Sequence, residues 1–169
     1  MKCQTLLVRM ISFSKWRQCT ENPNFKAEDL CADTVTSDLR TRNNTLSNWI
    51  ITNINNMDDA VLVLASERQR LEKLDLLWYE YEENKLKFVT RSTPSQTIIE
   101  DMRDKHVDIV NLNYGKLRNV IICFIEAITE NHYKTFSKKE VKNILLNAIK
   151  DNRLDINKLY PKVKEELQK

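Results

Sequence analysis

The stretch LDLLWYEYEENKLKFVT, residues 74–90, decides the fold class of this chain. Its two apolar, aromatic-rich halves flank the polar letters EEN, a pattern typical of a β-hairpin with a short turn. The same letters could instead continue the preceding helix to about Asn84, which would pack Trp49 and Trp78 together in a helical hairpin. Because aromatic residues favour strands, we expect the hairpin and keep the helical continuation as the alternative.

Before that stretch, the sequence predicts a second strand and two helices. Residues 44–52 combine Thr, Trp and two Ile in a short run, which favours a strand. Residues 26–40 and 56–74 carry apolar side chains at helical spacing, so each predicts an amphipathic helix. Residues 3–13 are apolar and partly β-branched, which fits either a first strand or a short helix.

After that stretch, the periodicity predicts helices almost throughout. Residues 93–112 place four apolar side chains in helical register, and residues 113–132 form a strongly apolar segment typical of a central core helix. Ser137 followed by Glu140 makes a capping box for the next helix, and residues 156–167 predict a last amphipathic helix.

We therefore expect a single domain over residues 1–169 of the α+β class, rich in helix, with a small sheet. Its strands are expected near residues 44–52 and 75–89. The alternative is an all-α helical bundle, which follows if residues 74–90 are helical.

Composition excludes several kinds of site. The chain has one glycine, Gly115, whereas phosphate-binding loops and dinucleotide fingerprints need several glycines. The four cysteines show no CxxC spacing, and His106 and His132 lie far apart, so we expect no metal and no cofactor. Scattered cysteines without a leader or a long apolar run predict reduced thiols in the cytoplasm and no membrane partner. Few glycines with abundant Lys, Asn and Ile are typical of an AT-rich, bacterial genome.

Charge gives a limited indication of partners. The net charge is +3, and residues 137–169 carry nine Lys or Arg against five Asp or Glu. A basic end steers anionic partners, and Arg beside Trp in residues 14–18 could contact nucleic acid. No helix-turn-helix, RNA-binding aromatic signature or zinc finger accompanies these residues, so nucleic acid stays a secondary hypothesis.

One group of acidic residues could form a metal site or a catalytic site. If residues 93–112 are helical, Glu100, Asp104 and Asp108 share one face, where carboxylates suit a hard cation. A carboxylate could also orient His106 for acid–base chemistry. Arg103 and Lys105 balance the charge, however, so a solvated helix face explains the pattern more simply.

The segment TSDLRTRNNTLSNW, residues 36–49, is the strongest candidate for a polar site. Arginine binds phosphate and carboxylate groups through two parallel hydrogen bonds, so its charged residues could receive an anion or a partner loop. A helix end at residues 42–44 explains the asparagines without a ligand. The candidate residues are Asp38, Arg40, Arg42, Asn44, Thr45 and Ser47.

No catalytic residue is assigned, and the leading hypothesis is a small cytoplasmic, non-enzymatic accessory protein. It would act through a protein partner or self-association, as an adaptor, subunit or antidote-like protein. The first alternative is an enzyme acting on nucleotides or nucleic acid, using the 36–49 segment or the group Asp104, His106 and Asp108. The second alternative is a structural homo-oligomer.

Overall fold

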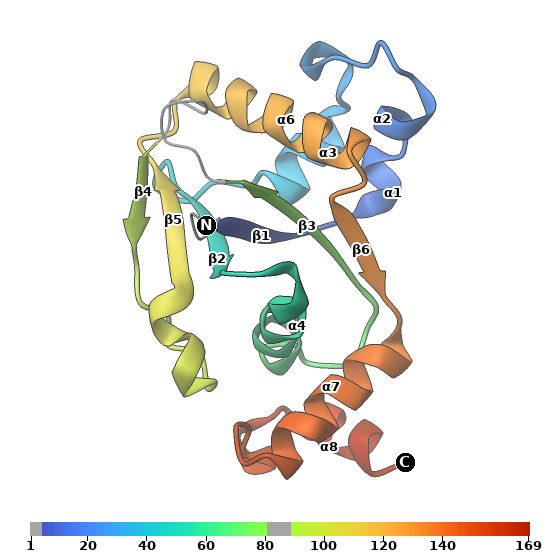
Figure 1. The fold of residues 1–169 in the computed structure, drawn as a ribbon, viewed down its shortest axis with the longest axis vertical. Coiled ribbons are helices and arrows are strands. Elements are labelled where there is room, and N and C mark those ends of the chain that lie inside the picture. The colour runs from blue at the N-terminus through green and yellow to red at the C-terminus, as the bar shows by residue number, and fades with distance from the viewer. Residues whose placement is uncertain (1–4, 81–88) are drawn as a thin grey trace.

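The computed structural model describes residues 5–80 and 89–169, and within them one antiparallel sheet organises the fold (Figure 1). The sheet has six strands in the order β4-β5-β2-β1-β3-β6, and every neighbouring pair is antiparallel. The strands are β1 Leu6–Ile11, β2 Leu46–Ile51, β3 Leu74–Glu80, β4 Val89–Ser92, β5 His106–Val110 and β6 Tyr133–Phe136.

Helices occupy both faces of the sheet (Figure 1). The α-helices are α1 Phe13–Trp16, α2 Gln18–Glu21, α3 Ala32–Asp38, α4 Met57–Ser66, α6 Tyr114–Thr129, α7 Lys138–Lys150 and α8 Pro161–Gln168. Short 3-10 turns are η1 Ala27–Asp29, η2 Ile54–Asn56, η3 Glu100–Lys105 and η4 Ile156–Lys158.

Two apolar cores form, one on each face, because strands of a covered sheet bury alternate side chains on opposite sides. On one face, Trp16 and Tyr79 pack against Phe124 of α6, with ring centroids 5.6 and 5.2 Å from the Phe124 ring. On the other face, α4 packs on the sheet, and α7 and α8 add Leu145 and Val163 to the same core.

The mixed α+β class is confirmed, and the all-α alternative is wrong. The sheet is larger than the predicted small sheet, because residues 6–11, 106–110 and 133–136 also form strands. Residues 46–51 confirm the strand predicted near 44–52. Helices α4, α6, α7 and α8 form within the segments where apolar periodicity predicted them, but α4 ends at Ser66, eight residues before the predicted end at residue 74.

The described ends of the hairpin predicted over residues 75–89 are strands, but they do not pair with each other. β3 pairs with β1 and β6, and β4 pairs with β5, so β3 and β4 are not neighbours. Six of the seven residues of β3 are buried or half-buried, as expected for a central strand covered on both faces. The predicted turn at residues 82–84, and residues 85–88 of the predicted second strand, lie outside the described residues.

The helix predicted over residues 93–112 is also wrong. The sequence His106–Val110 alternates half-buried and buried side chains and forms β5 between β2 and β4. Val107 and Ile109 satisfy a two-residue period as well as a helical one, and strand pairing on both sides decides between them. The predicted stack of Glu100, Asp104 and Asp108 on one helical face therefore does not form.

The capping box at the start of α7 is confirmed. The Ser137 hydroxyl accepts a hydrogen bond from the backbone N–H of Glu140, and the Glu140 carboxylate accepts one from the N–H of Ser137 at 2.7 Å. These Ser137 donors lower the pKa of Glu140. A lowered pKa means that the stabilisation is present near neutral pH and is lost as pH falls through that pKa.

Replacing Ser137 by alanine should lower the free energy of unfolding by about 1 kcal/mol, because a helix N-terminal N–H loses its acceptor. Urea denaturation at neutral pH followed by circular dichroism measures the change. Ser92→Ala, an exposed β4 position, is the control and should have little effect. Equal losses for both variants would contradict the capping role.

Within residues 5–80 and 89–169, no helix combines the length and the hydrophobicity that crossing a membrane requires.

Candidate binding groove

The 36–49 segment contains a tight turn rather than a long helix end. Helix α3 ends at Asp38, earlier than the predicted end at residues 42–44. Arg42 and Thr45 form an isolated antiparallel bridge, and Asn43 and Asn44 between them have φ values of 52° and 58°. Two left-handed asparagines suit a two-residue hairpin turn, which explains why this segment is rich in asparagine.

Asp38, the first predicted site residue, is turned into the protein. Only 8% of its surface is exposed. Its carboxylate accepts hydrogen bonds from the Ser12 backbone N–H at 2.7 Å, the Trp16 indole N–H at 2.9 Å and the Ser37 hydroxyl at 3.1 Å. These bonds join α3 to the end of β1 and to α1, which is a structural role.

Arg9, which sequence reasoning missed, fixes the same segment to the sheet. Its guanidinium donates to the backbone carbonyl of Asp38 at 2.9 and 2.7 Å and to that of Ser47. Burial lowers the pKa of Arg9, and Tyr79, Asp38 and Asp108 act in the opposite direction. Two carbonyls of the predicted site are therefore already bound inside the protein.

The other predicted site residues do not converge with Asp38. Arg40, Arg42 and Asn44 are exposed, and they line neither of the two cavities described below. The Thr45 hydroxyl donates to the Arg42 carbonyl at 2.8 Å, and the Ser47 hydroxyl donates to Asp108 of β5 at 2.7 Å. Anion or partner binding by this segment stays a prediction.

The second candidate group, Asp104, His106 and Asp108, is divided between two elements. Asp104 is exposed in η3, whereas His106 and Asp108 lie in β5. The Nδ1 atom of His106 lies 2.8 Å from the carbonyl of Thr93 and 2.9 Å from its hydroxyl, and Asp108 accepts from Ser47. In the described part of the chain, no three His, Cys, Asp or Glu side chains come together as metal ligands.

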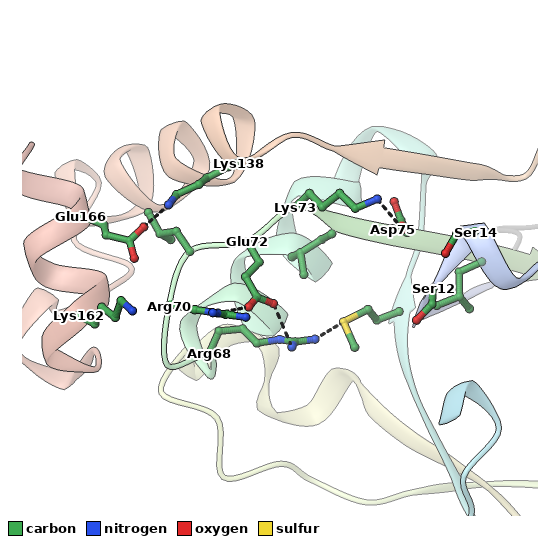
Figure 2. A pocket seen from close by; sticks show the side chains of 14 residues that line it. Ser12, Ser14, Arg68, Arg70, Glu72, Lys73, Asp75, Lys138, Lys162 and Glu166 are labelled. Atoms are coloured by element: carbon green, nitrogen blue, oxygen red, sulfur yellow. Dashed lines mark hydrogen bonds and ion pairs between the residues drawn. The ribbon is translucent and has the colours of Figure 1, made fainter. Parts of the chain in front are cut away.

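A charged groove lies elsewhere, between the 67–73 loop and the N-terminal parts of α7 and α8 (Figure 2). It consists of two cavities of about 830 and 730 Å³. Both cavities are lined by Arg68, Arg70, Glu72 and Lys162, so these four residues form the junction between them. The loop that carries three of them connects α4 to β3.

Outside the junction, the cations of the larger cavity are neutralised within the protein. Lys73 pairs with Asp75 at 3.6 Å, and Lys138 of α7 pairs with Glu166 of α8 (Figure 2). Asp75 is nearly buried, and it also accepts from Thr135 of β6 at 2.7 Å. These two pairs leave no net charge on that wall.

Glu166 places a carboxylate in the wall of the larger cavity. The ion pair with Lys138 lowers the pKa of Glu166, with smaller contributions from Lys162 and from the backbone N–H of Leu71. The carboxylate of α8 therefore contacts the first turn of α7 and the 67–73 loop, and stays ionised near neutral pH.

The junction itself has three cations and one carboxylate, and Glu67, which lines the smaller cavity, lowers the surplus of the whole groove to one positive charge. Glu72 is the carboxylate of the junction, and it pairs with Arg68 at 3.8 Å and with Arg70. Lys162 makes no ion pair with any described residue, and its side chain is exposed. The Arg70 side chain is 65% exposed, so its guanidinium is accessible to a ligand as well as to Glu72.

No sequence motif unites the groove, because its walls come from residues 10–14, 67–75, 138 and 160–166. The sequence indicated only part of the groove, through the basic character of its C-terminal region. The excess of Lys and Arg after residue 137 includes Lys138 and Lys162, but it does not single them out from the other lysines of that region. The charged run ERQRLEK, residues 67–73, belongs to the helix predicted over residues 56–74, but in the structure it forms the loop between α4 and β3 and lines a cavity together with residues of α8.

No protein-family model, curated protein or solved structure matches this chain.

Proposed function

We propose that this protein is a cytoplasmic accessory protein whose groove binds an acidic segment of a protein partner. The observation that carries the proposal is the junction, where Arg68, Arg70 and Lys162 meet a single carboxylate, Glu72. A partner's Asp or Glu side chains would replace or supplement Glu72, much as Glu166 already binds Lys138.

The distribution of carboxylates favours a polypeptide over a nucleic acid. Glu72, Asp75 and Glu166 line the larger cavity among its cations. A nucleic acid carries regularly spaced phosphates, which these carboxylates would repel along much of the groove. An acidic polypeptide can place its carboxylates beside the cations and neutral side chains beside Glu72, Asp75 and Glu166.

An aromatic side chain at the groove supports a protein partner. Tyr160 is 46% exposed and lines the smaller cavity beside Pro161. Tyrosine and arginine are enriched among the residues that dominate protein–protein binding energy. The other large exposed apolar side chains, at Ile54, Val89 and Leu146 among others, do not line the groove.

The cysteines support a reducing compartment. Cys31 is exposed, and burial raises the pKa of the Cys19 thiol to about 11. An exposed thiol persists where disulfides are kept reduced, as in a cytoplasm. The enzyme and homo-oligomer hypotheses gain no comparable observation from the groove.

Binding of an acidic probe peptide tests the proposal. A short fluorescent peptide of alternating Glu and Ala should bind at low ionic strength, and its Gln twin should not, because the cations of the groove outnumber its carboxylates. Fluorescence anisotropy measures both. The double variant Arg70→Met/Lys162→Met should bind the Glu peptide about tenfold more weakly, a loss of about 1.4 kcal/mol.

The matched control is Lys139→Met/Lys150→Met, which removes the same charge from exposed positions of α7 outside the groove. It should retain wild-type affinity apart from a small general effect. If both double variants bind equally, or if the Gln twin binds as well as the Glu peptide, the groove is not the binding site.

A further inference from the structure

A methionine sulfur lies in the wall of the groove and contacts one of its arginines. We infer that Met10 is a site of oxidation, where a peroxide converts the thioether to a sulfoxide and thereby weakens binding of the acidic partner. This regulation rests on the proposed function, because it acts on the same groove.

Met10 belongs to β1 and lines the groove from the sheet. It pairs with Leu76 of β3 in the sheet register, and it lines the larger cavity together with Arg68. Its side chain packs against the core on the α4 side and stays half-buried. The thioether is therefore held at the cavity wall, where a small oxidant from solvent can contact it.

Exposure separates Met10 from the other methionines that the structure describes. Met57 and Met102 are buried, with 4% and 3% of their surface exposed, whereas Met10 is half-buried. A peroxide has to contact the sulfur, so a buried methionine reacts only when the protein opens locally. We expect Met10 to react before Met57 and Met102 in the folded protein.

The reaction is an oxygen transfer from hydrogen peroxide. The sulfur lone pair attacks one peroxide oxygen, an S–O bond forms and the O–O bond breaks. The oxygen that stays on sulfur gives its proton, through solvent, to the oxygen that leaves as water. Sulfur loses two electrons and the peroxide gains them, and methionine sulfoxide reductases reverse the change.

Arg68 connects the sulfur to the binding surface. Its Nη2 atom contacts the Met10 sulfur, and its Nη1 atom lies 3.8 Å from the Glu72 carboxylate (Figure 2). A thioether sulfur is a weak hydrogen-bond acceptor, whereas a sulfoxide is polar and its oxygen accepts well. Oxidation therefore replaces a weak contact by a hydrogen bond that holds Arg68 toward β1.

The effect on the ligand follows from the position of Glu72. Its carboxylate is shared between Arg68 and Arg70. When Arg68 binds the sulfoxide, Glu72 is left to Arg70, which is the more accessible of the two, with 65% of its side chain exposed against 34%. An acidic ligand then competes with Glu72 for Arg70, so it binds more weakly.

Peroxide treatment of the whole protein tests the inference. Wild-type protein and Met10→Leu, a substitution that nearly conserves volume and removes the sulfur, are treated with hydrogen peroxide, and peptide mass spectrometry locates the added oxygen. Fluorescence anisotropy should show about fivefold weaker binding of the Glu–Ala peptide by oxidised wild-type protein, and unchanged binding by treated Met10→Leu. Both proteins carry Cys31→Ser, because that exposed thiol also reacts with peroxide.

Two further measurements connect the effect to Arg68. Treatment of the oxidised protein with methionine sulfoxide reductase should restore the affinity. In Arg68→Ala, which binds the peptide more weakly from the start, oxidation of Met10 should cause no additional loss. Circular dichroism should be unchanged by the treatment, and a loss of helical signal in place of a specific binding change would contradict the inference.

The outcomes separate the inference from the proposed function. Oxidation of Met57 or Met102 as fast as Met10 overturns the site, and a specific Met10 sulfoxide with unchanged peptide affinity overturns the regulation. Both results leave acidic-peptide binding intact. Equal losses in wild-type protein and Arg68→Ala overturn the role given to Arg68. Absence of peptide binding by the untreated protein overturns the proposed function and the regulation together.

Discussion

Replacing Asp38 by alanine should lower the free energy of unfolding by about 3 kcal/mol, a large fraction of the stability of an ordinary domain. The carboxylate is almost buried and accepts from the Ser12 backbone N–H and the Trp16 indole N–H. Trp16 has no exposed surface, so its N–H would stay buried without an acceptor. Leaving a buried donor unsatisfied costs more than the hydrogen bond itself contributed.

Urea denaturation followed by tryptophan fluorescence measures this loss. The matched control is Asp33→Ala, which removes an exposed carboxylate from the first turn of the same helix and should cost well under 1 kcal/mol. If Asp38→Ala costs no more than Asp33→Ala, the carboxylate is not the structural acceptor described above, and the 36–49 segment regains its place as a candidate binding site.

The second large effect is expected in binding. Replacing both Arg70 and Lys162 by glutamate should weaken binding of the Glu–Ala peptide by about 100-fold or more, because like charges placed together cost several kcal/mol. Arg40→Glu/Arg42→Glu changes the net charge by the same amount at exposed positions of the 36–49 segment. That control should reduce affinity only slightly, through weaker long-range attraction.

Anisotropy titrations at low and raised salt separate these two contributions. Long-range attraction is screened by salt, whereas loss of direct contacts persists. If the Arg40/Arg42 reversal abolishes binding and the Arg70/Lys162 reversal does not, the ligand binds at the segment favoured by the sequence, and the groove is not its site.

The sequence predicted the helices that carry their own local signal, either apolar side chains at helical spacing or a capping box. Helix α6 has one strongly apolar face, and α7 begins at a serine with a glutamate three residues later, so each carries its own signal. β5 carries no such local signal, because Val107 and Ile109 fit both a helix and a strand. Its pairing with β2 and β4 joins segments that are distant in the sequence. β6 has four residues, too few for a periodic pattern.

The candidate site could not be predicted for a similar reason. Residues 36–49 are conspicuous because their polar side chains are adjacent in sequence, but the fold uses Asp38 internally and turns the chain at Asn43 and Asn44. Arg70 and Lys162 are 92 positions apart in the sequence, and only the fold brings both to the lining of the same cavity. The charges of a groove made from distant segments are visible in the sequence, but their proximity is not.

The most direct test of the central claim, that the groove binds an acidic ligand, is a titration of isotope-labelled protein with the Glu–Ala peptide, followed by nuclear magnetic resonance. The largest shifts in backbone amide signals should occur at residues 67–73 and 160–166, which line the groove from its two sides. Shifts centred on residues 40–47, with the groove signals unchanged, would contradict the account.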